Sequence, residues 1–209
     1  MTDIIRDPQA IEQKSFEIID AEVGEHCFSE QEWPIVRRIV HTTADFDFVA
    51  NTLITDGAVA AALTVLQQGC AIYCDTNMVL SGVNKSRLTA FGCSISCHVG
   101  DTDVAEQAKA EGVTRSIVAL RKGVAEGCRI FLIGNAPTAL YELLQLCRDG
   151  KVEPALIVGA PVGFVGAAES KEELVASGLS QITCRGRKGG SAIAAAICNA
   201  LLLLAEKGN

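Results

Sequence analysis

The sequence has little positive charge and no apolar run long enough to cross a membrane. It contains 18 Lys and Arg against 25 Asp and Glu, so its formal net charge is −7. Because nucleic-acid binding needs a broad basic face, this balance argues against a nucleic-acid partner. The longest apolar segment, residues 192–205, spans 14 residues and includes Asn199, whereas a membrane-spanning helix needs about 20. We therefore expect no association with a membrane.

Features of secreted proteins and of multidomain chains are missing too. Residues 2–7 carry neither a basic region nor an apolar one, so we expect no signal peptide. The nine cysteines are odd in number and lie mostly in apolar runs such as residues 71–74, which is typical of reduced thiols in a cytoplasmic protein. No repeat, low-complexity stretch or linker interrupts the sequence, so we predict a single domain over residues 1–209.

Two common nucleotide-binding motifs are absent. The spacing of a phosphate-binding Walker A loop does not occur. Gly159, Gly163 and Gly166 do not have the Gly-x-Gly-x-x-Gly spacing of a dinucleotide site, so the sequence implies no NAD.

The cysteine pairs Cys70/Cys74 and Cys93/Cys97, with His98 adjacent, raise the question of a metal site. If each pair lies on a strand, its two thiols are about 13 Å apart at about 3.3 Å per residue. Zinc ligands lie about 2 Å from one ion, so only a cross-strand arrangement would bring these side chains together. We predict no metal site.

From residue 70 onward, short apolar runs alternate with helical segments. The runs that we interpret as strands are residues 70–74, 93–99, 128–133, 155–158 and 181–184. The helical segments are 103–111, 114–126, 137–148, 170–176 and 191–207, and earlier helices are expected at 8–23, 33–40 and 58–68. This alternation is typical of a parallel sheet with helices on both faces. We predict an α/β fold, a three-layer α/β/α sandwich of flavodoxin-like type with a mainly parallel, five-stranded sheet.

In open parallel sheets, ligands bind beyond the carboxyl ends of the strands. Three glycine-containing loops follow predicted strands, at residues 134–137, 159–166 and 185–190. The last loop carries Arg185, Arg187 and Lys188 just before the closing helix. Cations beside a helix amino terminus can bind a carboxylate or a phosphate, and the alternative is a solvated basic turn.

His41 lies between charged residues of both signs. Arg37 and Arg38 precede it, and Asp45 and Asp47 follow it. Charges this close can bring the pKa of an imidazole near neutrality. His41 is therefore a candidate for proton transfer.

The segment from His41 to Phe48, HTTADFDF, resembles the precorrin-8X methylmutase family, also called cobalt-precorrin-8 methylmutase. Blocks at residues 134–140, 161–171 and 185–192 agree with this family in the same order. The resemblance implies a homodimeric α/β/α isomerase of cobalamin (vitamin B12) biosynthesis that uses no cofactor. Such an enzyme moves a methyl group from C11 to C12 of a tetrapyrrole, precorrin-8X or cobalt-precorrin-8, and gives hydrogenobyrinate or cobyrinate. Whether the substrate already carries cobalt stays open.

The family's essential histidine falls on His41, which the resemblance makes the catalytic proton donor. The candidates for substrate binding, from the resemblance and from their charge, are Ser15, Arg38, Asn84, Arg115, Asn135, Arg185, Arg187 and Lys188. A 1,5-shift of methyl needs no nucleophile, metal or redox cofactor, and a general acid that protonates a ring nitrogen typically contributes about 10²- to 10⁴-fold in rate. Three alternatives stay open: a non-catalytic corrinoid-binding carrier, an unrelated flavodoxin-like enzyme or nucleotide binder, and a thiol-based metal or redox protein.

Overall fold

The computed structural model describes residues 5–208 of the chain. These residues form a single six-stranded sheet with helices around it. The strands are β1 (Thr52–Ile54), β2 (Ala71–Cys74), β3 (Ser94–Ser96), β4 (Ile130–Ile133), β5 (Leu156–Gly159) and β6 (Gln181–Cys184). Their order across the sheet is β1-β6-β5-β4-β2-β3. Strands β2 to β6 are parallel, and β1 pairs with β6 in the antiparallel direction.

The sequence prediction of an α/β sandwich is confirmed. The five expected strands correspond to β2 to β6, and numbered by themselves they lie in the order 2-1-3-4-5, which is the flavodoxin-like order. The structure adds a sixth strand, β1, that the sequence did not reveal. This strand has only three residues and follows directly on the short helix α3 (Asp47–Asn51), so it offers no alternating pattern to recognise.

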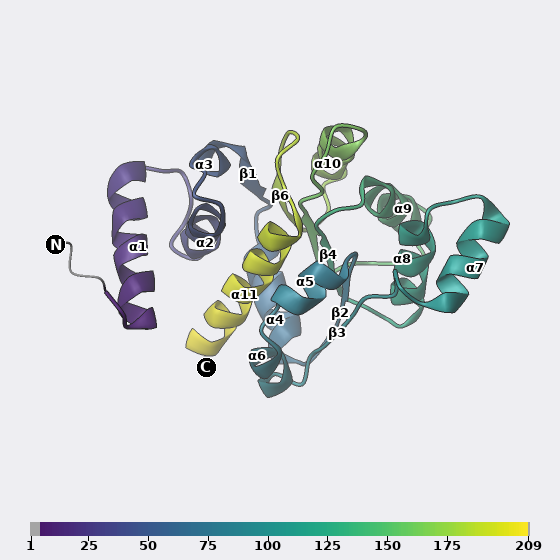
Figure 1. Cartoon of the computed structure of the whole chain (residues 1–209), viewed down its shortest axis with the longest axis horizontal. Helices are drawn as coiled ribbons and strands as arrows, with labels where there is room; N and C mark the ends of the chain where they lie inside the picture. The colour runs from purple at the N-terminus through teal and green to yellow at the C-terminus, as the bar shows by residue number, and fades with distance from the viewer. Residues whose placement is uncertain (1–4, 209) are drawn as a thin grey trace.

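Side chains of alternate strand residues point to opposite faces of the sheet and build two cores. On one face, Ile72, Leu132 and Val158 pack against α4 (Ala58–Gln67), α5 (Asn77–Gly82), α6 (Lys85–Ala90) and α11 (Ser191–Lys207). On the other, Phe131 and Ile157 pack against α7 (Thr102–Glu111), α8 (Arg115–Ala125), α9 (Pro137–Arg148) and α10 (Ala167–Ala176). The result is a three-layer arrangement (Figure 1).

Helices α1 (Pro8–Val23) and α2 (Trp33–Thr43) extend the first helical layer. Helix α2 packs against α11, and α1 packs against α2, so α1 lies at the outer edge of the molecule, at the purple end in Figure 1. The helices expected at 8–23, 33–40 and 58–68 are all present, and α2 continues past the expected end to include His41. None of the helices in residues 5–208 is long and apolar enough to cross a membrane.

Candidate functional site

His41 lies in the last turn of α2, where it is half-buried. The Phe16 ring of α1 packs against the imidazole edge-to-face, with 5.3 Å between ring centroids and 66° between planes. Within residues 5–208, neither imidazole nitrogen has a hydrogen-bond partner. The helix ends at Ala44, which is left-handed (φ 52°) and turns the chain toward Asp45. The imidazole is therefore held by packing, with both nitrogens free to exchange a proton.

Two ion pairs fasten α1 to α2 beside this imidazole. The Arg38 guanidinium lies 2.7 Å from the Glu12 carboxylate, and the Arg37 guanidinium lies 2.6 Å from that of Asp20. Both guanidinium groups stack on the Phe16 ring, at 4.3 Å for Arg37 and 5.1 Å for Arg38. Cations over an aromatic face are attracted by the ring quadrupole. Phe16 therefore connects both arginines and the imidazole.

The carboxylates after His41 contact the cation-rich loop rather than the imidazole. The Lys188 ammonium lies 2.6 Å from Asp45 and 2.7 Å from Asp47. These contacts raise the pKa of Lys188, and the hydrogen bond from Lys188 lowers the pKa of Asp45. The segment after α2 and the loop after β6 therefore meet, although they are more than a hundred residues apart in sequence.

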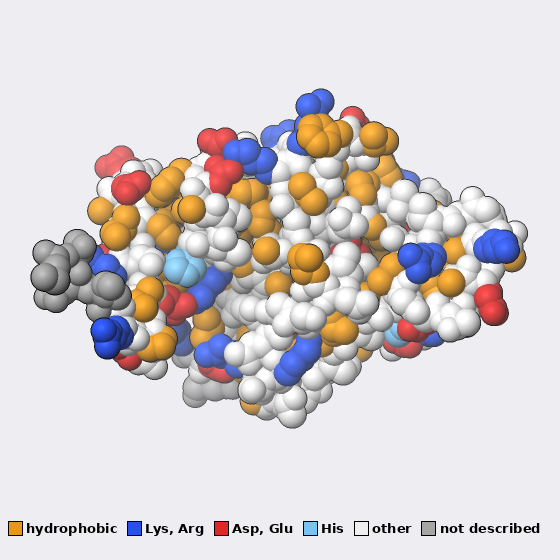
Figure 2. All heavy atoms as spheres, viewed as in Figure 1, with side chains coloured by type: hydrophobic (Ala, Val, Ile, Leu, Met, Phe, Trp, Pro, Cys, Tyr) orange, Lys and Arg blue, Asp and Glu red, His pale blue; other side chains and the backbone are white. Residues whose placement is uncertain are grey.

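The other cations of this loop have different surroundings. Arg185 forms a bidentate pair with Glu172, at 2.9 and 2.5 Å. Arg187 stacks 5.6 Å over the Phe164 ring and has no carboxylate partner in the described part of the chain. Figure 2 shows basic and hydrophobic side chains together at the top of the view, over the ends of β6 and α10. Arg187 is thus the cation of this loop that is available to a carboxylate ligand.

A buried carboxylate, Asp75, occupies the topological switch point of the sheet, between β2 and β4. Its side chain is 1% exposed and accepts backbone N–H groups from Gly134, Asn135 and Ala136 at 2.9, 2.7 and 2.7 Å. Burial raises the pKa of Asp75, and the three N–H groups oppose that shift. Flavodoxin-like folds bind phosphate at this position. Here the chain's own carboxylate fills it, which argues against the nucleotide-binding alternative.

Sequence reasoning did not find Asp75, although an acidic residue directly after a buried strand is a visible signal. Of the predicted site residues near it, Asn135 donates its backbone N–H to Asp75 while its side chain is exposed. Arg115, the first residue of α8, is exposed, and the neighbouring Thr114 hydroxyl lies 3.0 Å from that of Thr138 on α9. Arg115 and Asn135 therefore share the carboxyl edge of the sheet.

The remaining candidates make local contacts. The Ser15 hydroxyl donates to the Ile11 carbonyl one turn earlier in α1, at 2.8 Å. The Asn84 side chain caps α6 by accepting the Arg87 N–H at 3.0 Å. A cavity of about 340 Å³ between α1, α2 and α11 is lined by Arg38 but not by His41. The structure does not gather all the predicted residues around one pocket.

Comparison with known proteins identifies the family. A model of the family described as precorrin-8X methylmutase matches residues 10–204. The cobalt-precorrin-8 methylmutase of Leptospira interrogans is 48% identical, over 94% of each chain. The precorrin-8X methylmutase of Pseudomonas aeruginosa is 45% identical, over 96% of this chain and 98% of that one. The chain belongs to the precorrin-8X methylmutase family.

Members of this family are isomerases, and the structure agrees with that assignment. The solved structure of the precorrin-8X methylmutase from Thermus thermophilus superposes with a TM-score of 0.88 at 41% identity, over 96% of this chain and 97% of that one. The resemblance found in the sequence is thereby confirmed, and this methylmutase is an enzyme.

The cysteines of the methylmutase form cross-strand neighbours but no metal cluster. The β2–β3 register places Cys70 beside Cys93 and Cys74 beside Cys97, and the Cys70 and Cys93 sulfurs are 4.0 Å apart. All nine thiols are free. Within the described residues, no group of three or more His, Cys, Asp or Glu side chains could hold a metal ion.

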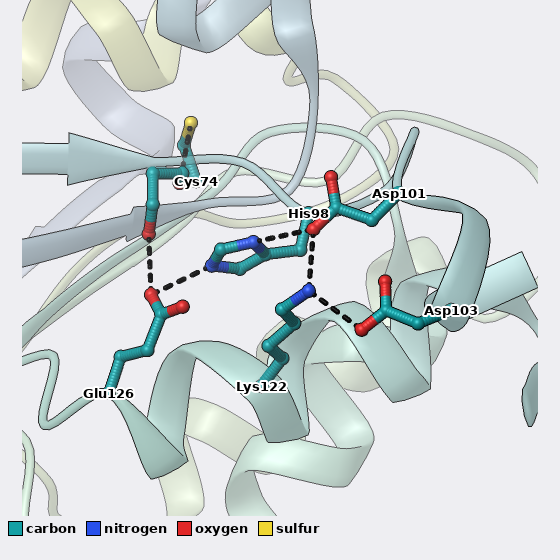
Figure 3. Close-up of polar contacts among 7 residues, drawn as sticks. Cys74, His98, Asp101, Asp103, Lys122 and Glu126 are labelled. Carbon is teal, nitrogen blue, oxygen red and sulfur yellow. Dashed lines mark hydrogen bonds and ion pairs between the residues drawn. The ribbon is translucent and has the colours of Figure 1, made fainter.

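His98, the other candidate metal ligand, is instead bound by carboxylates (Figure 3). Its ring nitrogens lie 3.0 Å from Asp101 and 2.9 Å from Glu126. The Lys122 ammonium bridges Asp101 and Asp103 at 2.8 Å each. These contacts join the end of β3 to helices α7 and α8, so the cluster is structural.

Proposed function

We propose that this methylmutase moves a methyl group from C11 to C12 of precorrin-8X or cobalt-precorrin-8 in cobalamin biosynthesis, giving hydrogenobyrinate or cobyrinate. The observation that carries the proposal is the placement of His41. Its imidazole is half-buried, both of its ring nitrogens are unpaired within residues 5–208, and Arg38 lies one helical turn away. That arrangement suits a group that gives and then recovers one proton.

In the proposed mechanism, His41 protonates a ring nitrogen of the macrocycle. The added charge withdraws electron density from the conjugated system, and the methyl group migrates with its bonding pair in a 1,5-sigmatropic shift. The proton then returns to the imidazole, so the enzyme ends unchanged. A positioned general acid typically contributes about 10²- to 10⁴-fold in rate. No step requires a nucleophile, a metal ion or a redox cofactor.

Cationic and polar groups are proposed to hold the macrocycle's carboxylates. Arg115 and Arg187 lack carboxylate partners in the described chain, so they can bind substrate directly. Arg38, Arg185 and Lys188 are already paired, so each can either exchange its partner for substrate or hold its element in place. Ser15, Asn84 and Asn135 are the proposed neutral contacts.

A homodimer is proposed to complete the binding surface. The cavity beside Arg38 measures about 340 Å³, which is near the lower end of the roughly 300–1,000 Å³ typical of small-ligand sites. A tetrapyrrole with its acidic side chains is a large ligand. Ile11 and Ile18 on α1 and Phe164 and Val165 after β5 are exposed, Val165 at 90%. Apolar groups of this kind favour coverage by a second copy of the chain.

We also propose that the enzyme acts in the cytoplasm.

The test is an assay with purified protein and each of the two substrates, the cobalt-free and the cobalt-containing macrocycle. Methyl migration changes the conjugation, so the visible spectrum reports turnover. His41→Ala should abolish turnover while the macrocycle still binds. His26→Ala is the matched control, because His26 stacks on Trp33 at 4.0 Å, away from the proposed proton transfer. Unchanged turnover in His41→Ala would refute the role of His41, and binding without turnover in the wild type would favour the carrier alternative.

A further inference from the structure

We propose that Lys171 is a positioning residue, whose buried ammonium fixes the cation-rich loop, residues 185–190, against the segment that follows His41. The inference rests on the proposed function, because that function gives the loop and His41 their roles. Lys171 does not touch the proposed reacting atoms, and it acts through the backbone of Lys188.

The Lys171 side chain is fully buried, at 0% exposure. Its Nζ donates a hydrogen bond of 2.7 Å to the carbonyl oxygen of Lys188. No carboxylate within residues 5–208 forms an ion pair with it. An ammonium without a paired anion is costly to bury, and an apolar side chain would fill the same space at less cost. The position therefore serves a purpose beyond packing.

The contacts of Lys188 connect that ammonium to the His41 segment. The Lys188 backbone accepts from Lys171, while the Lys188 side chain extends to Asp45 and Asp47. These two carboxylates lie just beyond Ala44, where α2 ends. Loss of the hydrogen bond from Lys171 would free the backbone from which the Lys188 side chain extends.

The loop fits closely against its neighbours, so a small displacement matters. The Gly190 N–H donates to the Ala160 carbonyl at 2.8 Å. A Cβ on Gly189 would lie 2.3 Å from the same oxygen. The Gly163 N–H donates to the Arg187 carbonyl at 3.2 Å. These contacts, together with the hydrogen bond from Lys171 to the Lys188 carbonyl, give Arg187 a defined position.

The ammonium also makes this arrangement sensitive to pH. Burial lowers the pKa of Lys171 to about 8, and the nearby Cys184 on β6 and Glu172 on α10 oppose that shift. As the pH rises through this value the ammonium loses its charge, and a charge-assisted hydrogen bond becomes an ordinary, weaker one. We expect the loop to become less protected over that range.

The experiment measures amide hydrogen exchange in wild type and in Lys171→Met, which keeps the length of the side chain and removes the ammonium. Exchange in residues 185–190 should accelerate about ten-fold in the variant, as expected for loss of one charge-assisted hydrogen bond, while exchange in β4 stays unchanged. Lys151→Met is the control, because Lys151 is exposed and forms its ion pair, among the described residues, with Asp149 alone. The kcat/KM for the macrocycle should fall by a similar factor, mainly through KM.

The wild type gives a second measurement that does not depend on the variant folding. Its protection factors in residues 185–190, which already correct for intrinsic exchange, should fall as the pH rises through about 8, the lowered pKa of Lys171. A folded Lys171→Met with wild-type exchange in the loop would overturn the proposal, and so would wild-type protection that is constant from pH 7 to about 9.5. Neither readout needs substrate, so a failure of the proposed methyl transfer would be seen separately, as no turnover in the wild type.

Discussion

Replacement of Asp75 by alanine should strongly destabilise the fold and create a site for a small anion. The carboxylate is 1% exposed and accepts three backbone N–H groups between 2.7 and 2.9 Å. Each buried donor left without a partner costs about 1–3 kcal/mol. Removal of a buried charge returns part of that sum. We expect the free energy of unfolding to fall by about 3–5 kcal/mol, whereas a typical domain has a free energy of unfolding of about 5–15 kcal/mol.

The assay is urea unfolding followed by circular dichroism, with and without formate. Formate presents the same two oxygens as the missing side chain, so it should raise the unfolding midpoint of Asp75→Ala and leave the wild type unchanged. Asp75→Asn is the matched control. This variant keeps one acceptor oxygen, and its free energy of unfolding should fall by about 1–3 kcal/mol because its amide N–H₂ faces at least one backbone donor. An Asp75→Ala protein whose free energy of unfolding lies within about 0.5 kcal/mol of the wild-type value would refute the reasoning. Three backbone donors without partners should cost more than that.

Two further predictions concern acid stability and thiol reactivity. The pKa of Asp101 is lowered, chiefly by the hydrogen bond from Lys122. Its contribution to stability is therefore present above the usual aspartate pKa and is lost as the pH falls through the lowered pKa. The unfolding midpoints of Asp101→Asn and wild type should differ at pH 6, and this difference should shrink as the pH falls below the usual aspartate pKa; a constant difference would contradict this. The hydrogen bond from Cys74 lowers the pKa of Cys97 to about 7, whereas burial raises that of the equally half-buried Cys147 to about 11. Iodoacetamide at pH 7 should thus label Cys97 before Cys147, as peptide mass spectrometry can show, and equal rates would count against it.

The layers of the fold and the loops of the candidate site were predictable because their signals are local. Strands β2, β4 and β5 are apolar runs bounded by helical segments, and the loop after β6 carries its cations within four residues of sequence. The strand β1 was not predictable, because its pairing with β6 joins Thr52 to Cys184. Only tertiary structure reveals that such a short segment lies in the sheet.

The pairing of charges was the part of the site that the sequence could not give. From sequence, Asp45 and Asp47 are the nearest acids after His41, and we expected them to influence the imidazole. In the structure they bind Lys188. Asp75 is visible in the sequence as an acid directly after a strand, but its partners begin at Gly134, after a different strand, and only the structure shows them. Sequence proximity identifies which groups are available, but packing decides which of them meet.

The short antiparallel strand β1 has a consequence for how the proposed site would move. The chain passes from His41 through α3 into β1, which pairs with β6, and the Arg185 N–H donates to the Asn51 carbonyl at 2.8 Å. His41 lies before β1 in the sequence and the basic loop follows β6, and these two strands are hydrogen-bonded to each other. A twist or shift of this sheet margin would carry both groups together, so their separation would be preserved while their distance to the opposite, β3 side of the sheet changes.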